Sequence, residues 1–211
     1  MIFEKPARVD RHEALRYAGH RGAPDARLLA QLDTAIAKIE QAAQPKWVYK
    51  LFSAADLAPV LKGESIKRHM QGCQNIFAMA VTLGSGVDGA LREAQQGDLA
   101  LGHLMDAAAT ALIESYAECA QETLRGIARQ RGLCLSARFS PGYGDMPLSV
   151  QGQLLALLNA QRAIGLSLTP HSLMLPQKSI TALCGLCQTP AKSGRGCSEC
   201  SLSGTCTLKE D

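Results

Sequence analysis

The residues from Arg138 to Leu148 combine a cation, two prolines and two glycines in one short segment between two apolar runs. Proline restricts the backbone torsion φ, and glycine permits torsions that other residues avoid. Together they let a loop hold its backbone N–H and C=O groups in positions where a ligand can bind them. Arg138 adds a planar cation with five donors, a good partner for a carboxylate. The pattern favours a ligand-binding loop. A tight strand-to-helix turn with a solvated arginine is the alternative.

Three acidic residues, Glu114, Glu118 and Glu122, follow one another at intervals of four within a helical pattern. This spacing stacks them on one face of the helix. Like charges so placed repel by a few tenths of a kcal/mol per pair, roughly, on an exposed face. The row is therefore either a solvated face or an acidic wall beside a cationic or hydroxyl-bearing ligand.

Five of the eight cysteines fall in residues 184–211, a segment rich in Gly, Ser, Thr and Lys that cannot form an apolar core. The spacing Cys-x-x-Cys lets two thiolates grip one metal ion, and two more cysteines complete a four-sulfur shell. The predicted ligands are Cys187, Cys197, Cys200 and Cys206. Zinc and an iron–sulfur cluster both fit four thiolates, and a reduced tail without metal is the alternative.

The other four cysteines are not predicted metal ligands. Cys184 ends an apolar run and is expected in the core. Cys73, Cys119 and Cys134 are expected to be buried, inert thiols.

A second glycine motif, from Gly84 to Gly89, matches the Gly-x-Gly-x-x-Gly pattern of dinucleotide-binding loops. That fingerprint also requires a strand that ends in an acid about twenty residues later. The residue at that distance, Asp106, falls inside a long helical pattern. We therefore expect a glycine-permitted turn that caps the next helix rather than a nicotinamide site.

Composition limits the class of protein. The chain has 211 residues, of which 46% are hydrophobic and only 4% aromatic, so an aliphatic, helix-rich core is expected. The net charge of +3 comes from scattered basic residues and argues against nucleic acid as partner. The sequence contains no run of about 18 apolar residues, so no membrane span is expected. The charged start, Met1 to Asp10, has no secretory pattern, so a cytoplasmic location is expected.

Periodicity and turn residues divide residues 1–183 into helices and strands, followed by the Cys-rich tail at 184–211. Helices are expected after Asp10, over Asp25 to Ala43, Ser65 to Gln71, His103 to Arg131 and Ser149 to Ile164, with Gly165 as the last helix's end. Strands are expected over Trp47 to Phe52, Ile76 to Leu83, Leu133 to Phe139, Leu173 to Leu175 and Ser179 to Cys184.

Together these segments resemble the activation (reactivation) domain of vitamin B12-dependent methionine synthase, in its free-standing form, over about residues 10–183. The resemblance is carried by the segments Glu13 to Gly19, Thr82 to Gly84, Glu114 to Glu122, Arg138 to Asp145 and Met174 to Ser179. It implies an α+β fold, with a twisted, mostly antiparallel sheet and flanking helices. The order of the expected elements is compatible with that fold.

The resemblance also implies that the loop binds S-adenosylmethionine. Arg138 suits the ligand's carboxylate, while Glu114 and Glu118 suit its ammonium group and ribose hydroxyls. The implied binding residues are Arg138, Ser140, Pro141, Gly142, Tyr143, Gly144, Glu114 and Glu118. Asp145 departs from the pattern of the fused domain, so its role stays open. No catalytic residue is assigned.

In the family's reaction, the inactive cob(II)alamin of a partner is reduced by one electron and methylated by S-adenosylmethionine. This chain has no corrinoid motif, so the resemblance implies an accessory subunit of a cobalamin-binding methyltransferase, either methionine synthase or a related corrinoid protein. The electron would come from a donor such as flavodoxin or ferredoxin, or through a cluster in the tail. The main alternative is a non-enzymatic metal-binding adaptor whose tail recruits a partner. A nicotinamide oxidoreductase is a third hypothesis.

Overall fold

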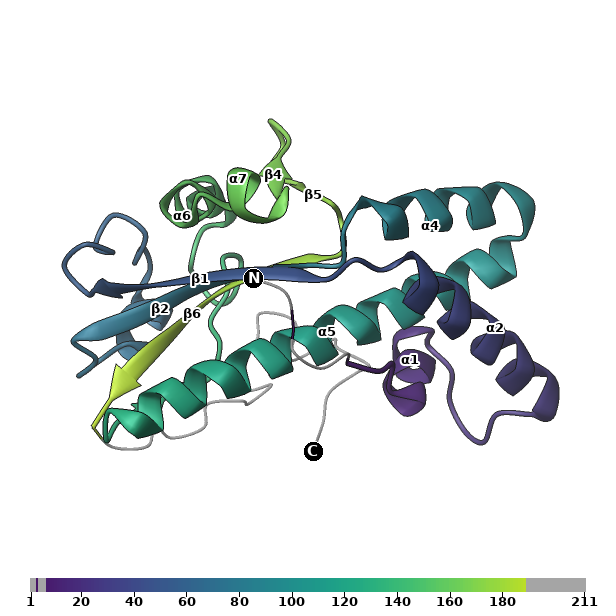
Figure 1. The fold of residues 1–211 in the computed structure, drawn as a ribbon, viewed down its shortest axis with the longest axis horizontal. Helices are drawn as coiled ribbons and strands as arrows, with labels where there is room; N and C mark the ends of the chain where they lie inside the picture. The colour runs from purple at the N-terminus through teal and green to yellow at the C-terminus, as the bar shows by residue number, and fades with distance from the viewer. Residues whose placement is uncertain (1–2, 4–6, 189–211) are drawn as a thin grey trace.

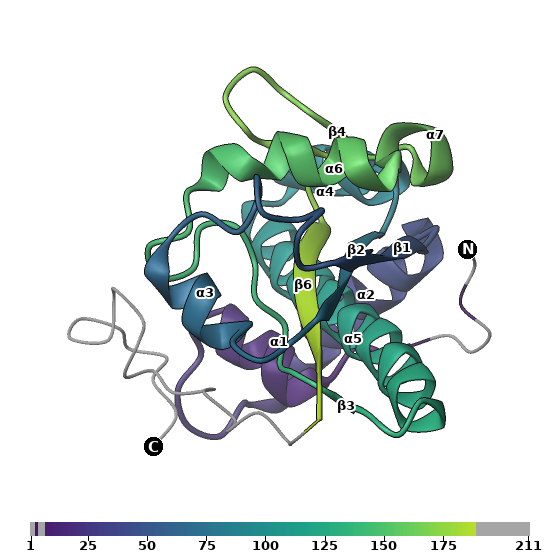
Figure 2. The ribbon, with the colours of Figure 1, turned by 90° about the vertical axis from the view of Figure 1, so that its left-hand side faces the viewer.

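The computed structural model describes residue 3 and residues 7–188. Its centre is a four-stranded antiparallel sheet in the order β1-β2-β6-β3, with α5 along one face and α6 and α7 on the other (Figure 1). The strands are β1 (Lys46–Ser53), β2 (Asn75–Thr82), β6 (Ser179–Cys187) and β3 (Cys134–Leu135). Figure 2 shows the same layers from the side. The α+β fold predicted from the sequence is confirmed.

Strand β2 is the middle of the core because its apolar run is buried on both faces. Alternate residues of a strand point to opposite faces of the sheet. Phe77, Met79 and Val81 accordingly pack in the cluster that contains α5. Ile76 and Ala78 pack in the cluster that contains α6 and α7. The sheet thus separates two cores.

The helices on one side are grouped around α5 (Leu99–Gln130), the longest element. They are α1 (Arg11–Tyr17), α2 (Ala26–Ala42) and α4 (Ser85–Gly97). Asp10 accepts the N–H groups of His12 and Glu13 at 2.8 and 3.1 Å, and so caps α1 as predicted. Asp25 caps α2 in the same way. Among the described helices, none is both long enough and apolar enough to cross a membrane.

The other side holds shorter elements: α3 (Glu64–His69), η1 (Leu148–Val150), α6 (Gln151–Leu158), α7 (Ala160–Ile164), β4 (Ser167–Leu168) and β5 (Met174–Leu175). The single helix predicted from Ser149 to Ile164 is wrong, because Asn159 adopts a left-handed conformation with φ of 54° between α6 and α7. Gly165, with φ of 74°, ends α7 as predicted.

Two predicted strand boundaries are also corrected. The strand expected from Leu133 to Phe139 shrinks to β3 because the Ser136 hydroxyl, rather than its carbonyl, accepts the N–H of Gly185 at 2.9 Å. The chain rejoins the sheet only at a single bridge between Phe139 and Leu183. Strand β6 continues to Cys187, so it crosses the predicted division of the chain at 183/184.

Candidate functional site

Arg138 lies where the segment after β3 meets α5. The neighbouring Phe139 exchanges two backbone hydrogen bonds with Leu183, at 2.9 and 2.8 Å, which fix this segment at the sheet edge. From there the Nη2 atom of Arg138 donates to Glu114 Oε2 at 3.0 Å and lies 3.8 Å from Glu118 Oε2. The structure therefore brings together the loop's cation and two acids that the sequence places 24 and 20 residues away.

This group of three charges is partly open to solvent. The side chain of Arg138 is 19% exposed, whereas those of Glu114 and Glu118 are 43% and 48% exposed. Among the described residues, Nη2 is the only Arg138 nitrogen that makes a hydrogen bond. A guanidinium has five N–H donors, and two of them along one edge can pair with a planar anion such as a carboxylate. Two carboxylates beside it suit a ligand that also carries positive charge.

The acidic row is not a like-charge face. Glu118 lies 3.8 Å from an Arg125 nitrogen, and Glu122 pairs with both Arg125 and, at 3.2 Å, Arg129. Arginines between the acids offset the repulsion expected from their spacing. Only the first two acids of the row contact Arg138, and Arg125 links Glu122 to the second of them, Glu118.

The loop after Phe139 is held by its own backbone. The N–H groups of Gly142 and Tyr143 donate to the carbonyls of Met146 and Ser140 at 3.0 and 3.1 Å. These two N–H groups therefore shape the loop rather than face a ligand. Gly142 has a φ of 92°, a conformation that favours glycine. The side chain of Tyr143 remains 58% exposed.

Asp145, whose role the sequence left open, caps another helix. Its carboxylate accepts the N–H groups of Glu64 and Ser65 at 2.7 and 2.9 Å, at the first turn of α3. These backbone hydrogen bonds hold the pKa of Asp145 below its ordinary value. A Cβ on Gly144 would lie 2.7 Å from the hydroxyl of Ser65, so glycine also permits the close approach.

Helix α3 supports the segment at a second point. His69 donates from Nε2 to the carbonyl of Ala137 at 2.9 Å, and its ring lies 5.2 Å from that of Phe139. Sequence reasoning missed these contacts of Asp145 and His69, because each joins positions more than 65 residues apart. The only sign of this support in the sequence was Asp145, an acidic residue directly after the glycine-containing loop.

Most of the cysteine predictions change. Cys187, a predicted metal ligand, forms a disulfide with Cys73, which was predicted as an inert thiol. A disulfide sulfur is not a thiolate, so Cys187 can ligate a metal only after reduction. The described residues contain no group of three or more side chains that could hold a metal ion. The other predicted ligands, Cys197, Cys200 and Cys206, lie outside the described residues.

The remaining thiols differ in burial. Cys119 is exposed and Cys134 half-buried, so their predicted burial is wrong. Cys184 is buried as predicted, and burial raises the pKa of its thiol to about 12 despite the opposing charge of Arg138. It is therefore a neutral core residue beneath the charged group.

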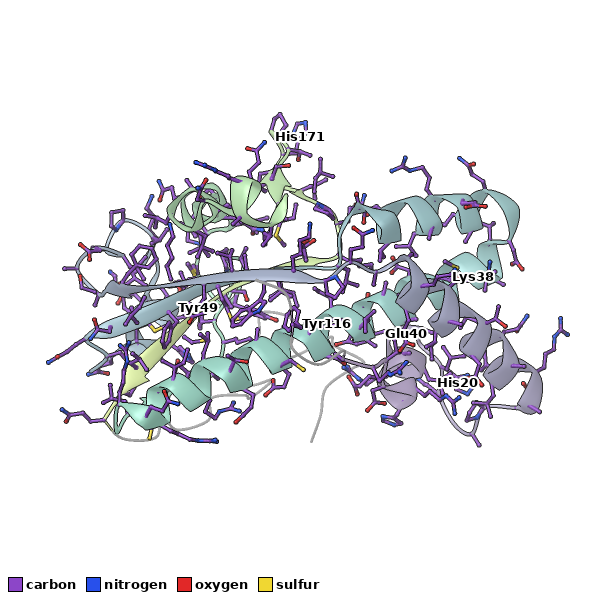
Figure 3. All side chains as sticks on the ribbon, in the orientation of Figure 1. His20, Lys38, Glu40, Tyr49, Tyr116 and His171 are labelled. Carbon is purple, nitrogen blue, oxygen red and sulfur yellow. A yellow bond between two sulfur atoms is a disulfide. The ribbon has the colours of Figure 1, made fainter. Side chains whose placement is uncertain are left out.

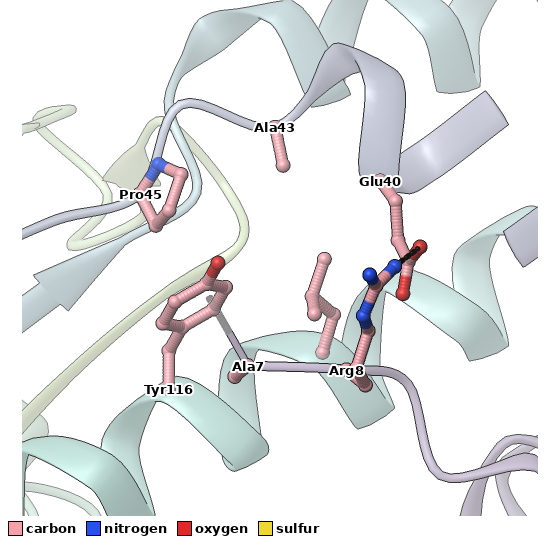
Figure 4. A pocket seen from close by; sticks show the side chains of 7 residues that line it. Ala7, Arg8, Glu40, Ala43, Pro45 and Tyr116 are labelled. Atoms are coloured by element: carbon pink, nitrogen blue, oxygen red, sulfur yellow. Dashed lines mark hydrogen bonds and ion pairs between the residues drawn. The ribbon is translucent and has the colours of Figure 1, made fainter. Parts of the chain in front are cut away.

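A small cavity of about 150 Å³ lies elsewhere, between α2, α5 and the start of β1 (Figure 4). Tyr116 points its hydroxyl into it, and the ion pair between Arg8 and Glu40 lies at its side. Tyr116 and Tyr49 lie between α5 and the sheet (Figure 3). Pockets for drug-sized ligands measure roughly 300 to 1,000 Å³, so this cavity is too small for a nucleoside-sized ligand.

The glycine motif after β2 is structural, as predicted. Gly84 has a φ of 85° and precedes α4, while a Cβ on Gly86 would lie 2.5 Å from the carbonyl oxygen of Ala42. Asp106 is within α5 and pairs with Lys178 at 2.9 Å. No acid ends a strand at the position that a nicotinamide site requires, within the described residues.

Comparison with known proteins finds a likeness in structure but not in sequence. No protein-family model and no curated protein sequence matches this chain. A crystal structure of the MetH reactivation domain bound to AdoHcy is similar, with a TM-score of 0.64 and 19% identity. The match covers 84% of this chain and 73% of that one. The chain therefore has the fold of a MetH reactivation domain.

Proposed function

We propose that this chain binds S-adenosylmethionine at Arg138, Glu114 and Glu118 and supports the reductive methylation of cob(II)alamin on a partner methyltransferase. The observation that carries the proposal is the contact of Arg138 with both acids at a half-open position of a reactivation-domain fold. The MetH domain of that fold was crystallised with AdoHcy. AdoHcy is S-adenosylmethionine without the transferable methyl group, which supports a ligand of the same class here.

The charges at the site match those of the ligand. The α-carboxylate of S-adenosylmethionine suits the guanidinium of Arg138, which forms bidentate pairs with carboxylates. Its α-ammonium group and cationic sulfonium suit the carboxylates of Glu114 and Glu118. The loop residues Ser140, Pro141, Gly142, Tyr143 and Gly144 are proposed to contact the rest of the ligand.

The chain's part in the reaction is to position the methyl donor. The partner's cobalamin supplies the metal that accepts the methyl group, and a separate one-electron donor such as flavodoxin or ferredoxin supplies the electron. Holding the sulfonium in a fixed orientation toward the partner lowers the entropic part of the barrier. The ionic contacts at Arg138 and the support of the loop by Asp145 serve that orientation.

Calorimetry with S-adenosylmethionine tests the binding site. Arg138→Ala is expected to weaken binding roughly 10- to 100-fold, because it removes a charge-assisted hydrogen bond. Arg129→Ala is the matched control: its side chain is 66% exposed and pairs only with Glu122 among the described residues. Binding that is absent in the wild type, with and without the cobalamin partner, would contradict the proposal.

The reactivation step is tested with the partner methyltransferase in the cob(II)alamin state, a one-electron reductant and S-adenosylmethionine. The wild-type chain is expected to restore methylcobalamin, seen by absorption, and Arg138→Ala is expected to fail at the same ligand concentration. If restoration proceeds equally without this chain, the proposed role is wrong even where binding is found.

For the Cys-rich tail we propose a metal site formed by Cys197, Cys200 and Cys206 with Cys187, which can join them only after its disulfide with Cys73 is reduced. An iron–sulfur cluster that passes the electron is the finer hypothesis. Four thiolates fit either that cluster or zinc. Protein purified without oxygen is expected to contain iron and sulfide and to absorb visible light. A colourless protein with zinc alone would exclude the cluster, and a protein without metal would exclude the site.

A shortened chain separates the reactivation component from the adaptor alternative. It should end at Gln188, because β6 extends to Cys187 and an earlier end would remove part of the central sheet. This variant is expected to keep S-adenosylmethionine binding. If the chain is an adaptor, the shortened variant should lose partner binding completely, whereas Arg138→Ala should still bind the partner.

A further inference from the structure

The segment that carries Arg138 holds one extra residue between its two pairings with β6. Leu135 pairs with Leu186, and Phe139 bridges to Leu183. The segment therefore advances four positions while β6 advances three. One extra residue on one side of an antiparallel pair is a β-bulge, which bends the strand and changes where its side chains point.

This bulge decides which face of the sheet Arg138 reaches. In a regular strand, residues four positions apart point to the same face. Leu135 instead packs against the cluster that contains α5, and Phe139 against the cluster that contains α6 and α7. Arg138, the neighbour of Phe139, accordingly lies on the α5 side, where it meets Glu114. A regular strand continued from Leu135 would point Arg138 away from this acid.

Two donors hold the carbonyl of Ala137, which precedes Arg138. The Ser136 hydroxyl accepts the N–H of Gly185 at 2.9 Å and donates to the Ala137 carbonyl, also at 2.9 Å. The Nε2 atom of His69 donates to the same carbonyl at 2.9 Å. A carbonyl oxygen only accepts, so Nε2 must carry a hydrogen. The peptide bond between Ala137 and Arg138 is therefore fixed both from within the bulge and from α3.

Helix α3 gives His69 a firm base. Ile66 and Met70, on either side of His69 in the sequence, are buried in the cluster that contains α6 and α7. Just after the helix, Cys73 is joined to Cys187 of β6 by the disulfide. The core and the sheet thus both hold α3, and the imidazole keeps its hydrogen bond directed at one position of the bulge.

We propose that His69 is a positioning residue of the S-adenosylmethionine site: with Ser136 it holds the bulge in the form that directs Arg138 to the ligand's carboxylate. The inference rests on the proposed function and deepens it, because it gives the reason why Arg138 can select the amino-acid end of the ligand. His69 acts on the ligand only through Arg138. The loop from Ser140 to Gly144 has its own tie to α3 through Asp145, so its contacts do not depend on His69.

Two ligands test this role by calorimetry. S-adenosylmethionine carries the amino-acid end, and 5′-methylthioadenosine lacks it. His69→Phe keeps an aromatic ring without the donor and is expected to weaken S-adenosylmethionine binding roughly 3- to 10-fold, the effect of one hydrogen bond. Binding of 5′-methylthioadenosine is expected to change less than about twofold. His69→Gln, whose amide can donate to the same carbonyl, is expected to bind S-adenosylmethionine within about twofold of the wild type.

A control and a double-mutant cycle separate positioning from folding. His103→Phe is the matched control, because His103 makes a hydrogen bond of the same kind, 3.1 Å from the carbonyl of Ala18 and not to the loop. It is expected to leave both affinities within about twofold. In an Arg138→Ala background, His69→Phe is expected to change S-adenosylmethionine affinity by less than about twofold, because the group that His69 positions is gone.

Three results would overturn the inference. Equal weakening of both ligands by His69→Phe would indicate a purely structural role. Equal weakening of S-adenosylmethionine binding by His69→Phe and His69→Gln would show that the donated hydrogen bond is not what matters. Unchanged S-adenosylmethionine affinity in His69→Phe would remove the role of His69 while leaving the proposed function intact. Only a wild type that binds no S-adenosylmethionine would remove both.

Discussion

The segment from Gly84 to Gly89 and the loop from Ser140 to Gly144 both place glycines between a strand and a helix. In the first, Gly86 makes room for the carbonyl of Ala42, which would lie 2.5 Å from a Cβ at this position. In the second, Gly142 supplies a backbone torsion, and the loop follows Arg138, which meets Glu114. The first segment is closed by the chain's own backbone, whereas the second lies beside partly exposed charges.

The difference shows that a glycine pattern alone does not tell a tightly packed turn from a ligand-binding loop. The two are distinguished by whether other helices or strands place charged side chains beside the glycines. Helix α4 begins against the end of α2, where Gly86 closely approaches the backbone of Ala42. At Arg138, α5 brings two acids and α3 braces the loop through Asp145. Substitutions at the two glycine segments should therefore change different properties.

The largest effect on stability is expected from Gly86→Ala. The added methyl group would clash with the backbone carbonyl of Ala42, which cannot rotate away as a side chain could. The free energy of unfolding should therefore fall by roughly 1–3 kcal/mol. Gly89→Ala in the same helix is the matched control, because nothing lies within 4 Å of its Cβ position. It should stabilise the chain by up to about 1 kcal/mol through helix propensity. Urea unfolding measures both, and equal signs for the two variants would contradict the packing explanation.

Gly144→Ala is expected to lower both stability and ligand affinity. Its φ of 53° costs a non-glycine residue roughly 1–2 kcal/mol, and the new Cβ would meet the side chain of Ser65. Because the loop must shift, S-adenosylmethionine binding should weaken as well, whereas Gly86→Ala should leave the binding constant unchanged. Gly126→Ala, with open space around it in α5, is the control. Intact binding in Gly144→Ala would show that the loop's shape is not needed.

Much of the fold follows from local sequence, and much of the site does not. The four-residue spacing of Glu114 and Glu118 fixes their shared helix face, and caps such as Asp10 fix where helices begin. The length of β3 was not predictable, because the Ser136 side chain replaces a ladder hydrogen bond that the apolar pattern implies. The break at Asn159 likewise depends on one residue's left-handed torsion within a continuous helical pattern.

Contacts between residues far apart in the chain were the hardest feature to predict from the sequence. The disulfide between Cys73 and Cys187 joins residues 114 positions apart, and no spacing rule selects that pair from eight cysteines. The family resemblance placed Arg138, Glu114 and Glu118 in one predicted ligand site, because their charges suit those of the ligand. Their direct contact with each other was not predicted.

Asp145→Asn should change the acid sensitivity of the protein. The folded-state pKa of Asp145 lies below its ordinary value of 3.8 because it accepts backbone N–H groups of α3. Its ionic contribution to stability is therefore fully present above pH of about 4 and is lost as the pH falls through the lowered pKa. In urea unfolding, the stability difference between wild type and variant should be constant from pH 7 to 5 and shrink toward pH 3. A difference that does not depend on pH would contradict the charged cap.

The smallest effect is expected from Glu122→Gln, and it tests where the ligand site ends along α5. Glu122 pairs with Arg125 and Arg129 at the surface, and its side chain is 52% exposed. Exposed ion pairs contribute about 0–1 kcal/mol, so stability should change by less than roughly 0.5 kcal/mol. Affinity for S-adenosylmethionine should stay within about twofold of the wild type, whereas Glu114→Gln should weaken it more. If calorimetry finds that both substitutions weaken binding equally, the acids act as one extended negative surface. The specific contacts of Arg138 would then not define the site.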